Sequence, residues 1–198
     1  CRDLGCMPYY WYENFWAGRW VSETVQRSSE TIGSAQIRTW QTPVGTLREE
    51  SRFVSESVSR AITKYPVESS DDLDVLLYIL DHSRWEPANM RGYSRRMKSW
   101  SAFDGLPSLA MPRSPLSAFL VEWAGVQNGV YLMCDARDRV EACLKRFEEL
   151  EATVLKALCD LAPPLVHFPD NLTSEVYTGF FDAYMAGCYE NRLSLLHA

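Results

Sequence analysis

The sequence contains no long apolar stretch and no concentration of positive charge. Its longest uninterrupted apolar run, Val75 to Leu80, covers six residues, whereas a transmembrane helix needs about 20. Lys and Arg total 20 against 26 Asp and Glu, which gives a net charge of −6, and no block of basic residues occurs. We therefore expect neither a membrane-spanning segment nor a nucleic-acid partner.

Several chemical motifs are also missing. The six cysteines include no Cys-x-x-Cys pair, so neither a zinc ribbon nor a thioredoxin-type site is supported. No Gly-rich phosphate loop, nucleophile elbow or zinc-protease motif occurs. Cys143 and Cys159 fall in a strongly helical stretch, where a free cysteine usually packs as a small buried hydrophobe. We expect reduced cysteines and a cytoplasmic protein.

Apolar and aromatic residues, in contrast, are plentiful. Of 198 residues, 46% are hydrophobic, which suffices for a folded core. Seven are Trp, and residues 1–20 concentrate aromatic side chains without a period of 2 or 3.6. Such a stretch is expected to cover a core or to line the mouth of a pocket. The first residue is Cys1 rather than Met, which suggests a processed chain or a piece of a longer one.

Residues 21–58 have the pattern of an antiparallel β-meander. Apolar and polar residues alternate from Val21 to Val25 and again from Ala35 to Thr39. Gly33 interrupts the first run. Thr42-Pro43-Val44-Gly45 interrupts the second and suits a type I turn. A third strand is expected within Thr46–Val54.

Residues 66–198 change to helices that are separated by short apolar segments. Expected helix starts are Ser69 with Asp72 as a capping box, Pro87 for a helix through Trp100, and Ser114 capping a helix that begins at Pro115. The longest helix is expected from Asp135 to the Pro163-Pro164 pair, and a final helix from Ser174 onward. Short strands are expected at Leu106–Met111 and Leu165–Phe168. This alternation is typical of parallel β/α architecture.

Two of the expected strands are followed by polar side chains. Arg113 and Ser114 follow the first, where a guanidinium beside a helix N-terminus suits a carboxylate or phosphate. Asp170 and Asn171 follow the second. Because ligands bind at the C-terminal ends of parallel strands, these four residues are candidates for a ligand site. The alternative is that they form only helix caps, turns and solvated side chains. His167 and Asp170 supply two metal-ligand types without a third, so no metal site is predicted.

The residues also resemble a known family. The runs TPVGTL (42–47), SPLSAFLVEWAG (114–125) and HFPDNLTSEVYTGFFDAYMAGCYENRLSLLHA (167–198) are similar to the uroporphyrinogen decarboxylase superfamily. That superfamily contains true decarboxylases and methylcobamide-dependent methyltransferases. The resemblance implies an eight-stranded β/α barrel with its active site at the C-terminal mouth. Because such a barrel needs about 250 residues, it implies that residues 1–198 are a single, incomplete TIM-type barrel domain with an inserted β-meander.

The resemblance also implies roles for particular residues. Arg2 corresponds to the first arginine of the motif with which decarboxylases bind substrate carboxylates, and Cys6 stands where the second is expected. Val121 replaces a tyrosine of those enzymes, and Asn171 falls near their substrate-binding serine. These departures weaken the case for porphyrinogen decarboxylation by this sequence.

Three functions follow as hypotheses. In a decarboxylase, Arg2 and Arg113 would bind a small carboxylate-rich substrate together with Ser114 and Asn171, and Asp170 would be catalytic by stabilising positive charge on a protonated pyrrole. In a methyltransferase, zinc would activate a thiol and a separate corrinoid protein would carry the methyl group. The alternative is a non-catalytic binding or assembly domain. The open strand edges of an incomplete barrel further predict either a homodimer or aggregation.

Overall fold

The computed structural model describes residues 9–12, 16–20, 22–88, 90–102 and 105–197. The chain divides into two compact units, each assembled from separate stretches of sequence. Unit 1 comprises Cys1–Arg19, Trp85–Ser114 and Glu149–Ala198. Unit 2 comprises Trp20–Arg84 and Pro115–Glu148. The fold is mixed α/β, in agreement with the class expected from the sequence.

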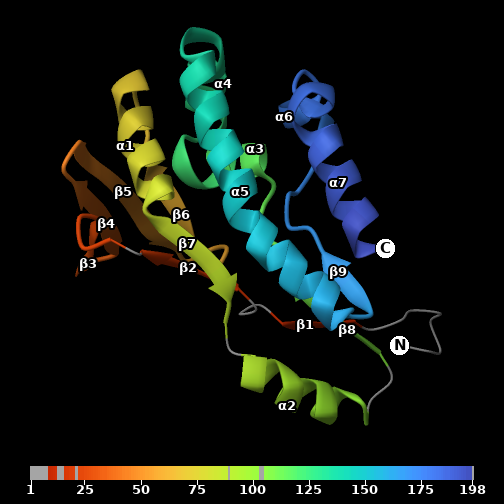
Figure 1. The fold of residues 1–198 in the computed structure, drawn as a ribbon. Helices are drawn as coiled ribbons and strands as arrows, with labels where there is room; N and C mark the ends of the chain where they lie inside the picture. The colour runs from red at the N-terminus through yellow and green to blue at the C-terminus, as the bar shows by residue number, and fades with distance from the viewer. Residues whose placement is uncertain (1–8, 13–15, 21, 89, 103–104, 198) are drawn as a thin grey trace. The chain divides into compact units, whose positions relative to one another are not determined.

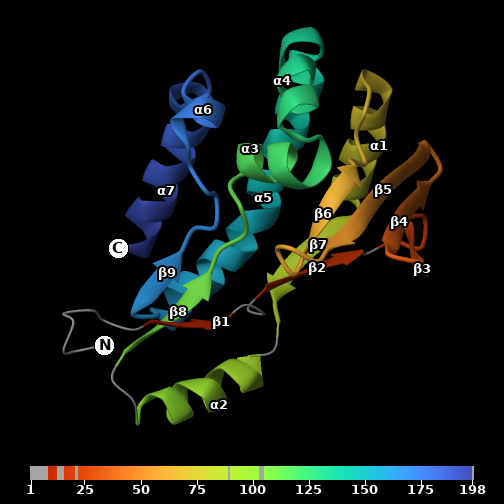
Figure 2. The ribbon, with the colours of Figure 1, turned by 180° about the vertical axis from the view of Figure 1, so that it is seen from behind.

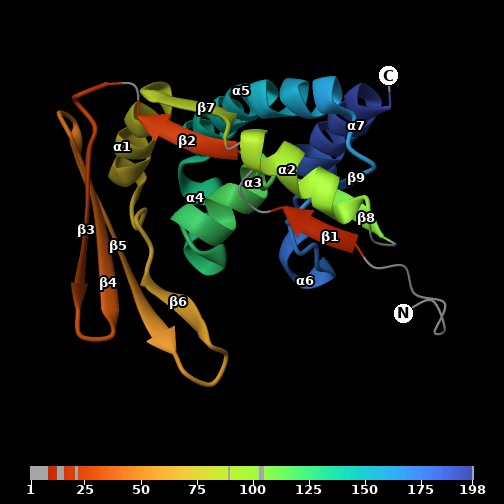
Figure 3. The same cartoon turned by 90° about the horizontal axis from the view of Figure 1, so that it is seen from below.

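Unit 2 contains a four-stranded antiparallel sheet. Its strands follow one another in the order of the chain: β3 (Gln26–Ile32), β4 (Ala35–Thr42), β5 (Gly45–Val54) and β6 (Ser59–Lys64). Figure 3 shows the β3–β4 and β5–β6 hairpins at the same end of this sheet. The predicted antiparallel meander is thus confirmed, with two differences in extent. It begins at Gln26 rather than at residue 21, and it includes the fourth strand, β6, beyond residue 58. Most of the side chains on β6 are exposed, so it has no apolar alternation to reveal it.

The two predicted hairpin turns are present. Gly33 connects β3 and β4 with φ +62°, a left-handed conformation that glycine adopts without steric cost. Thr42 and Gly45 face each other across the next turn, and the Thr42 hydroxyl donates to the Gly45 carbonyl oxygen at 2.9 Å. These turns set the register of β3, β4 and β5.

Helix α1 (Ser70–Asp81) packs on this unit and begins where the sequence predicts. The Asp72 carboxylate accepts the backbone N–H of Ser69 at 2.8 Å, which is the reciprocal bond of a capping box. One face of the helix is fully buried; it consists of Leu73, Leu76, Ile79 and Leu80. Burial of that stripe holds α1 in place, because each leucine or isoleucine stabilises by about 1.5–3 kcal/mol when buried.

The remaining helices of unit 2 are α3 (Pro115–Ala118), the short π-helix η2 (Phe119–Trp123), α4 (Val126–Asp135) and the part of α5 (Arg137–Leu161) up to Glu148. The predicted start at Pro115 is confirmed. Asp135 is the last residue of α4, so the prediction that it caps the longest helix is wrong. The Ala136 carbonyl instead accepts the first helical bond of α5, from Val140 N–H at 3.1 Å.

Unit 1 contains a three-stranded parallel sheet. Its order is β1 (Tyr9–Tyr12), β8 (Leu106–Ala110) and β9 (Leu165–His167), and both neighbouring pairs run parallel. In Figures 1 and 2, helix α2 (Met90–Trp100) lies below β1 and β8, whereas α7 (Ala186–Leu196) lies above them. Two of the predicted strands, at Leu106–Met111 and Leu165–Phe168, are therefore present.

Two helix boundaries in unit 1 differ from the prediction. Pro87 ends strand β7 (Ser83–Pro87), which pairs with β2 (Trp16–Trp20), and does not begin a helix. The last helical stretch is not continuous: it consists of α6 (Ser174–Tyr177), the π-helix η3 (Phe181–Met185) and α7. Proline tolerates both the first turn of a helix and the end of an edge strand, so the residue type alone did not decide between them.

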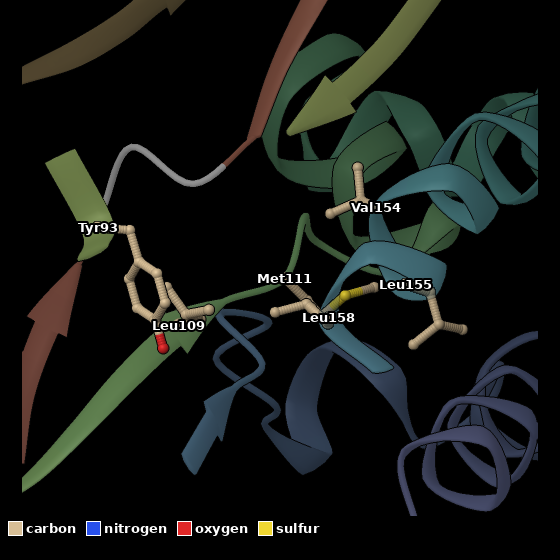
Figure 4. Close-up of a cluster of buried hydrophobic side chains, with 6 residues drawn as sticks. All are labelled: Tyr93, Leu109, Met111, Val154, Leu155 and Leu158. Carbon is tan, nitrogen blue, oxygen red and sulfur yellow. The ribbon is translucent and has the colours of Figure 1, made fainter. Parts of the chain in front are cut away.

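The core of unit 1 joins the sheet to two helices (Figure 4). Helix α2 contributes Tyr93, and strand β8 contributes Leu109. Met111, directly after β8, packs with them, and α5 contributes Val154, Leu155 and Leu158. Because β8 is the central strand, these contacts fix the position of its C-terminal end. In the part of the chain that the structure describes, no helix has the length and apolar character needed to cross a membrane.

Candidate functional site

The C-terminal ends of β8 and β9 lie side by side in unit 1. The strands are parallel, with Ala110 opposite His167. The backbone N–H of Met111 donates to the His167 carbonyl at 2.9 Å and extends the pairing beyond the last ladder residue. The two loops that the sequence identified, one after each strand, therefore meet at one edge of the sheet.

Ser114 and Asp170 connect these two loops directly. The backbone N–H of Ser114 donates to Oδ1 of Asp170 at 2.8 Å, and both residues are buried. Arg113, which is half-buried, donates from its guanidinium to the Pro169 carbonyl. The Ser114 hydroxyl is buried without a hydrogen-bond partner among the described residues. Ser114 thus contributes its N–H to Asp170, whereas its side chain does not act as the expected helix cap.

Asp170 is the centre of a buried polar network. Only 1% of its surface is exposed. The Tyr189 hydroxyl donates to its Oδ2, and Nη1 of Arg192 lies 4.0 Å from the same oxygen. The Tyr177 hydroxyl donates to its backbone carbonyl at 3.5 Å. These hydrogen bonds and the opposite charge of Arg192 therefore offset the unfavourable desolvation free energy of the buried carboxylate.

Arg192 extends the network to helix α5. Its side chain is fully buried, and its Nε donates to Oε1 of Glu151 at 3.2 Å while Nη2 contacts Oε2. This is the two-pronged geometry in which a guanidinium binds a carboxylate best. The Cys188 thiol donates to the same Oε1 at 3.7 Å. Arg192 therefore stands between two buried carboxylates, Glu151 on α5 and Asp170 after β9.

Aromatic rings enclose this ion pair. The Arg192 guanidinium carbon lies 5.4 Å from the Phe168 ring centroid and 5.9 Å from that of Tyr189. The two rings meet edge to face at 5.6 Å. Ring faces attract a cation, so they stabilise the guanidinium in a place that excludes water.

The protonation of two members follows from this environment. Burial and the hydrogen bond to Asp170 raise the pKa of the Tyr189 phenol far above its ordinary value. Burial alone would lower the pKa of Arg192, but the hydrogen bond and charge of Glu151, with the charge of Asp170, raise it above its ordinary value. Tyr189 therefore remains a neutral donor and Arg192 a cation throughout the physiological range.

The candidate residues from the sequence fall in three groups. Arg113, Ser114 and Asp170 come together at the C-terminal ends of β8 and β9. Asn171 follows Asp170 directly, is exposed, and adopts φ +50°, a left-handed turn that asparagine tolerates well. Arg2 lies outside the described residues.

Five members of the network were not predicted: Glu151, Tyr177, Cys188, Tyr189 and Arg192. The sequence does indicate that Glu151 is buried, because it lies four residues after Phe147 and three before Val154, on the apolar face of α5. A charge on such a face requires a buried partner. Tyr189 and Arg192 carry no comparable signal, because α7 is short and only weakly amphipathic.

The described residues include no group of three or more His, Cys, Asp or Glu side chains arranged to hold a metal ion. His167 and Asp170, the pair noted in the sequence, gain no third ligand within them. Comparison of the chain with protein-family models, curated proteins and solved structures found no match.

Proposed function

We propose that this chain belongs to a β/α-barrel enzyme that decarboxylates a small, carboxylate-rich tetrapyrrole, as the resemblance to the uroporphyrinogen decarboxylase superfamily implies. One observation carries the proposal. The two loops that the sequence singles out as a candidate ligand site meet at the C-terminal ends of neighbouring parallel strands, joined by the Ser114–Asp170 hydrogen bond. Ligand sites of parallel β/α folds lie at that edge.

Arg113 and Ser114 supply the groups for substrate binding. The half-buried Arg113 guanidinium stands at the edge, where a charge-assisted hydrogen bond to a substrate carboxylate is stronger than in open water. The Ser114 hydroxyl is buried without a partner among the described residues, and the proposal assigns it to a second oxygen of the substrate. Asn171 is exposed beside them and offers an amide. In the proposal Arg2 adds a second cation.

In the proposal Asp170 does not contact the substrate directly; it places a negative charge near the substrate ring. A proton from water adds to a pyrrole carbon and makes the substrate ring cationic. The bond between the side-chain methylene carbon and its carboxylate then breaks, its electron pair neutralises the ring and leaves an exocyclic methylene, and CO₂ departs. A second proton from water adds to that methylene carbon while the ring carbon returns its proton, so that in total one proton replaces CO₂. A fixed carboxylate stabilises that cation electrostatically. Because Ser114, Tyr189 and Arg192 already hold the Asp170 oxygens, its charge is held in one place before substrate arrives.

Corrinoid-linked methyl transfer is the other activity that the resemblance implies. It would require zinc and a corrinoid protein. The described residues provide no set of three zinc ligands, so no step of the proposal uses zinc.

The test uses the full chain with three ligands. Uroporphyrin binding is measured by quenching of tryptophan fluorescence, decarboxylation by chromatography of products from uroporphyrinogen, and methyl transfer by loss of methylcobalamin in the presence of zinc and a thiol. We expect uroporphyrin to bind and Arg113→Gln to weaken that binding about tenfold or more. The matched control is Arg95→Gln, an exposed arginine on α2, which should bind like the parent chain.

Asp170→Asn separates charge from shape. It keeps an amide oxygen for the Ser114 N–H, so we expect binding to persist while turnover falls about tenfold or more. Loss of methylcobalamin in this assay would overturn the decarboxylase proposal in favour of methyl transfer. Absence of uroporphyrin binding would leave the non-catalytic binding or assembly domain as the better hypothesis.

We also propose a second copy of this chain as a partner in a homodimer, and the cytoplasm as its location. Strands β1 and β9 are the outer strands of the parallel sheet among the described residues, and outer strands offer unpaired backbone groups to another chain. Sedimentation of the full chain tests this: a dimer is expected, and a monomer at every concentration would refute it.

A further inference from the structure

The outer face of helix α2, in unit 1, carries a row of three cations. Arg91, Arg95 and Lys98 are all exposed, and they lie four and three residues apart along the helix. At about 100° per residue, these positions fall within about 60° of one another around the helix and span about 10 Å along its axis. We call the three residues the α2 basic stripe. They are separated in the sequence, and only the helix brings them to one side.

The opposite face of α2 explains why the stripe faces solvent. Tyr93 is buried in the core with Leu109 of β8 (Figure 4). Met97 and Trp100 are half-buried and pack against the same core. These three positions lie on the side of the helix opposite the stripe. Burial of the apolar side therefore fixes the rotation of α2 about its own axis and holds the stripe outward.

The three cations of the stripe have no partner within the part of the chain that the structure describes. Their side chains form neither an ion pair nor a hydrogen bond with a described residue. Elsewhere, exposed lysines pair with an acid four residues away, as Lys64 does with Glu68 and Lys156 with Asp160. Helix α2 contains no Asp or Glu, so it supplies no such partner for its own cations.

Helix α2 also differs in sign from the rest of the chain. Its four basic residues are Arg96 and the three of the stripe, so a net charge of −6 for the whole chain and +4 for α2 leaves −10 elsewhere. Charges act over about 8 Å at physiological ionic strength. A partner small enough to contact only α2 therefore meets positive charge, whereas a long polyanion also meets the net negative charge of the chain.

The side chains of α2 favour a carboxylate-bearing protein over a membrane. None of the exposed side chains described on this helix is apolar, so they offer nothing to insert between lipids. Two of the three stripe residues are arginines, and a guanidinium binds a carboxylate through two parallel hydrogen bonds. Ser94 and Ser99 border the stripe on its two sides. Their small side chains let another helix approach closely.

We propose that the α2 basic stripe binds an acidic helix of a partner protein. Arg91, Arg95 and Lys98 each pair with an Asp or Glu of that helix, whose carboxylates follow the same four- and three-residue spacing. Complementary charge of this kind selects the partner and speeds its association. The interaction uses none of the residues at the C-terminal ends of β8 and β9, and it does not depend on the proposed decarboxylase function.

The probe is an alanine-rich helical peptide of about 20 residues that carries three glutamates at this spacing. Its control has the same composition, but its glutamates are five residues apart and so point to three sides of the helix. Fluorescence anisotropy of the labelled peptides measures their binding to the full chain at low salt. We expect the striped peptide to bind at least about fivefold more tightly than the control, and added salt to weaken its binding.

A triple substitution tests the stripe itself. Arg91→Gln, Arg95→Gln and Lys98→Gln together should weaken binding of the striped peptide about tenfold or more. The matched control removes the same three charges at exposed positions outside α2, as Arg52→Gln, Arg137→Gln and Lys145→Gln, and should bind like the parent chain. All six side chains are exposed, so we expect both variants to fold, which circular dichroism checks.

Charge reversal provides a second test. With glutamate at all three stripe positions, the chain should bind the corresponding lysine peptide and lose the glutamate peptide.

Four results would overturn the proposal. Equal affinity for the striped and control peptides, or equal weakening by the two triple variants, would show that net charge alone acts. Tighter binding of phosphatidylserine vesicles or single-stranded DNA than of the striped peptide would assign the stripe to a membrane or a nucleic acid. Dissociation of a homodimer by the stripe substitutions would assign it to a second copy of this chain.

Discussion

The backbone N–H of Ser114 donates to Oδ1 of Asp170 at 2.8 Å, although 56 residues separate the two in the chain. The bond joins the loop after β8 to the loop after β9 and is buried at both ends. It holds the candidate site together, since a buried N–H without an acceptor costs about 1–3 kcal/mol.

Substitution of Asp170 should separate its hydrogen bond from its charge. Asp170→Ala leaves the Ser114 N–H without an acceptor and Arg192 with one fewer carboxylate, so we expect a loss of about 3–5 kcal/mol in the free energy of unfolding. Asp170→Asn keeps an oxygen for Ser114 and should cost about half as much. Urea unfolding followed by circular dichroism measures both. Asp160→Ala, at an exposed position, is the control, and equal losses in the Ala and Asn variants would show that the Ser114 bond contributes nothing.

The Glu151–Arg192 pair should show strong coupling. Removal of either partner, as Arg192→Met or Glu151→Met, leaves a buried charge unpaired and should lower the free energy of unfolding by about 3–5 kcal/mol. The double variant should lose clearly less than the sum of the two, because Glu151 and Arg192 are then both absent and only Asp170 is left without its cation. A double-mutant cycle in urea measures this coupling. Additive losses would mean that the two side chains stabilise the protein independently.

Cys143 should make the protein less stable at high pH. Burial, with the nearby charges of Asp74 and Asp81, raises the pKa of this thiol from 9.0 to about 12. Above pH 9 the unfolded chain therefore releases a proton that the folded chain retains, so stability is full below pH 9 and falls as pH rises toward 12. Relative to Cys143→Ala, the parent chain should lose about 1.4 kcal/mol between pH 8 and about pH 10. An unchanged difference between the two proteins over that range would contradict the raised pKa.

The same burial predicts slow alkylation. Cys143 is fully buried and donates to the Leu73 carbonyl at 3.6 Å, whereas Cys134 is exposed. Because the thiolate is the nucleophile, iodoacetamide should modify Cys134 in the folded protein and Cys143 only after unfolding. Mass spectrometry of the peptides distinguishes the two sites. Equal rates in the folded protein would show that the helix around Cys143 opens readily.

Two helical glycines should respond oppositely to alanine. A Cβ at Gly129 in α4 would lie 2.4 Å from Cδ2 of the buried Leu120, so Gly129→Ala should destabilise by about 1–3 kcal/mol despite its better helix propensity. A Cβ at Gly187 in α7 would meet nothing within 4 Å, so Gly187→Ala should stabilise by about 0.5–1 kcal/mol. Thermal unfolding of both variants measures the two signs. A stabilising Gly129→Ala would mean that η2 moves away without cost.

Local patterns predicted much of the fold. The capping box at Ser69, the turns at Gly33 and Gly45, and the strands at Leu106–Met111 and Leu165–Phe168 depend on neighbouring residues, and all are present. The predictions at Pro87 and Asp135 were wrong because each residue type suits two local structures. Strand β6 was missed because a mostly exposed strand has no apolar periodicity.

For the candidate site, the sequence alone determined which loops carry polar groups: Arg113 and Ser114 after one strand, Asp170 and Asn171 after another. It also determined the antiparallel meander, since alternation and turn residues act over a few positions. Only the tertiary structure decided that Ser114 meets Asp170, and that Arg192 and Glu151 surround that carboxylate. The physical reason is that a buried charge is defined by its partner, and these partners lie 19 to 56 residues away along the chain.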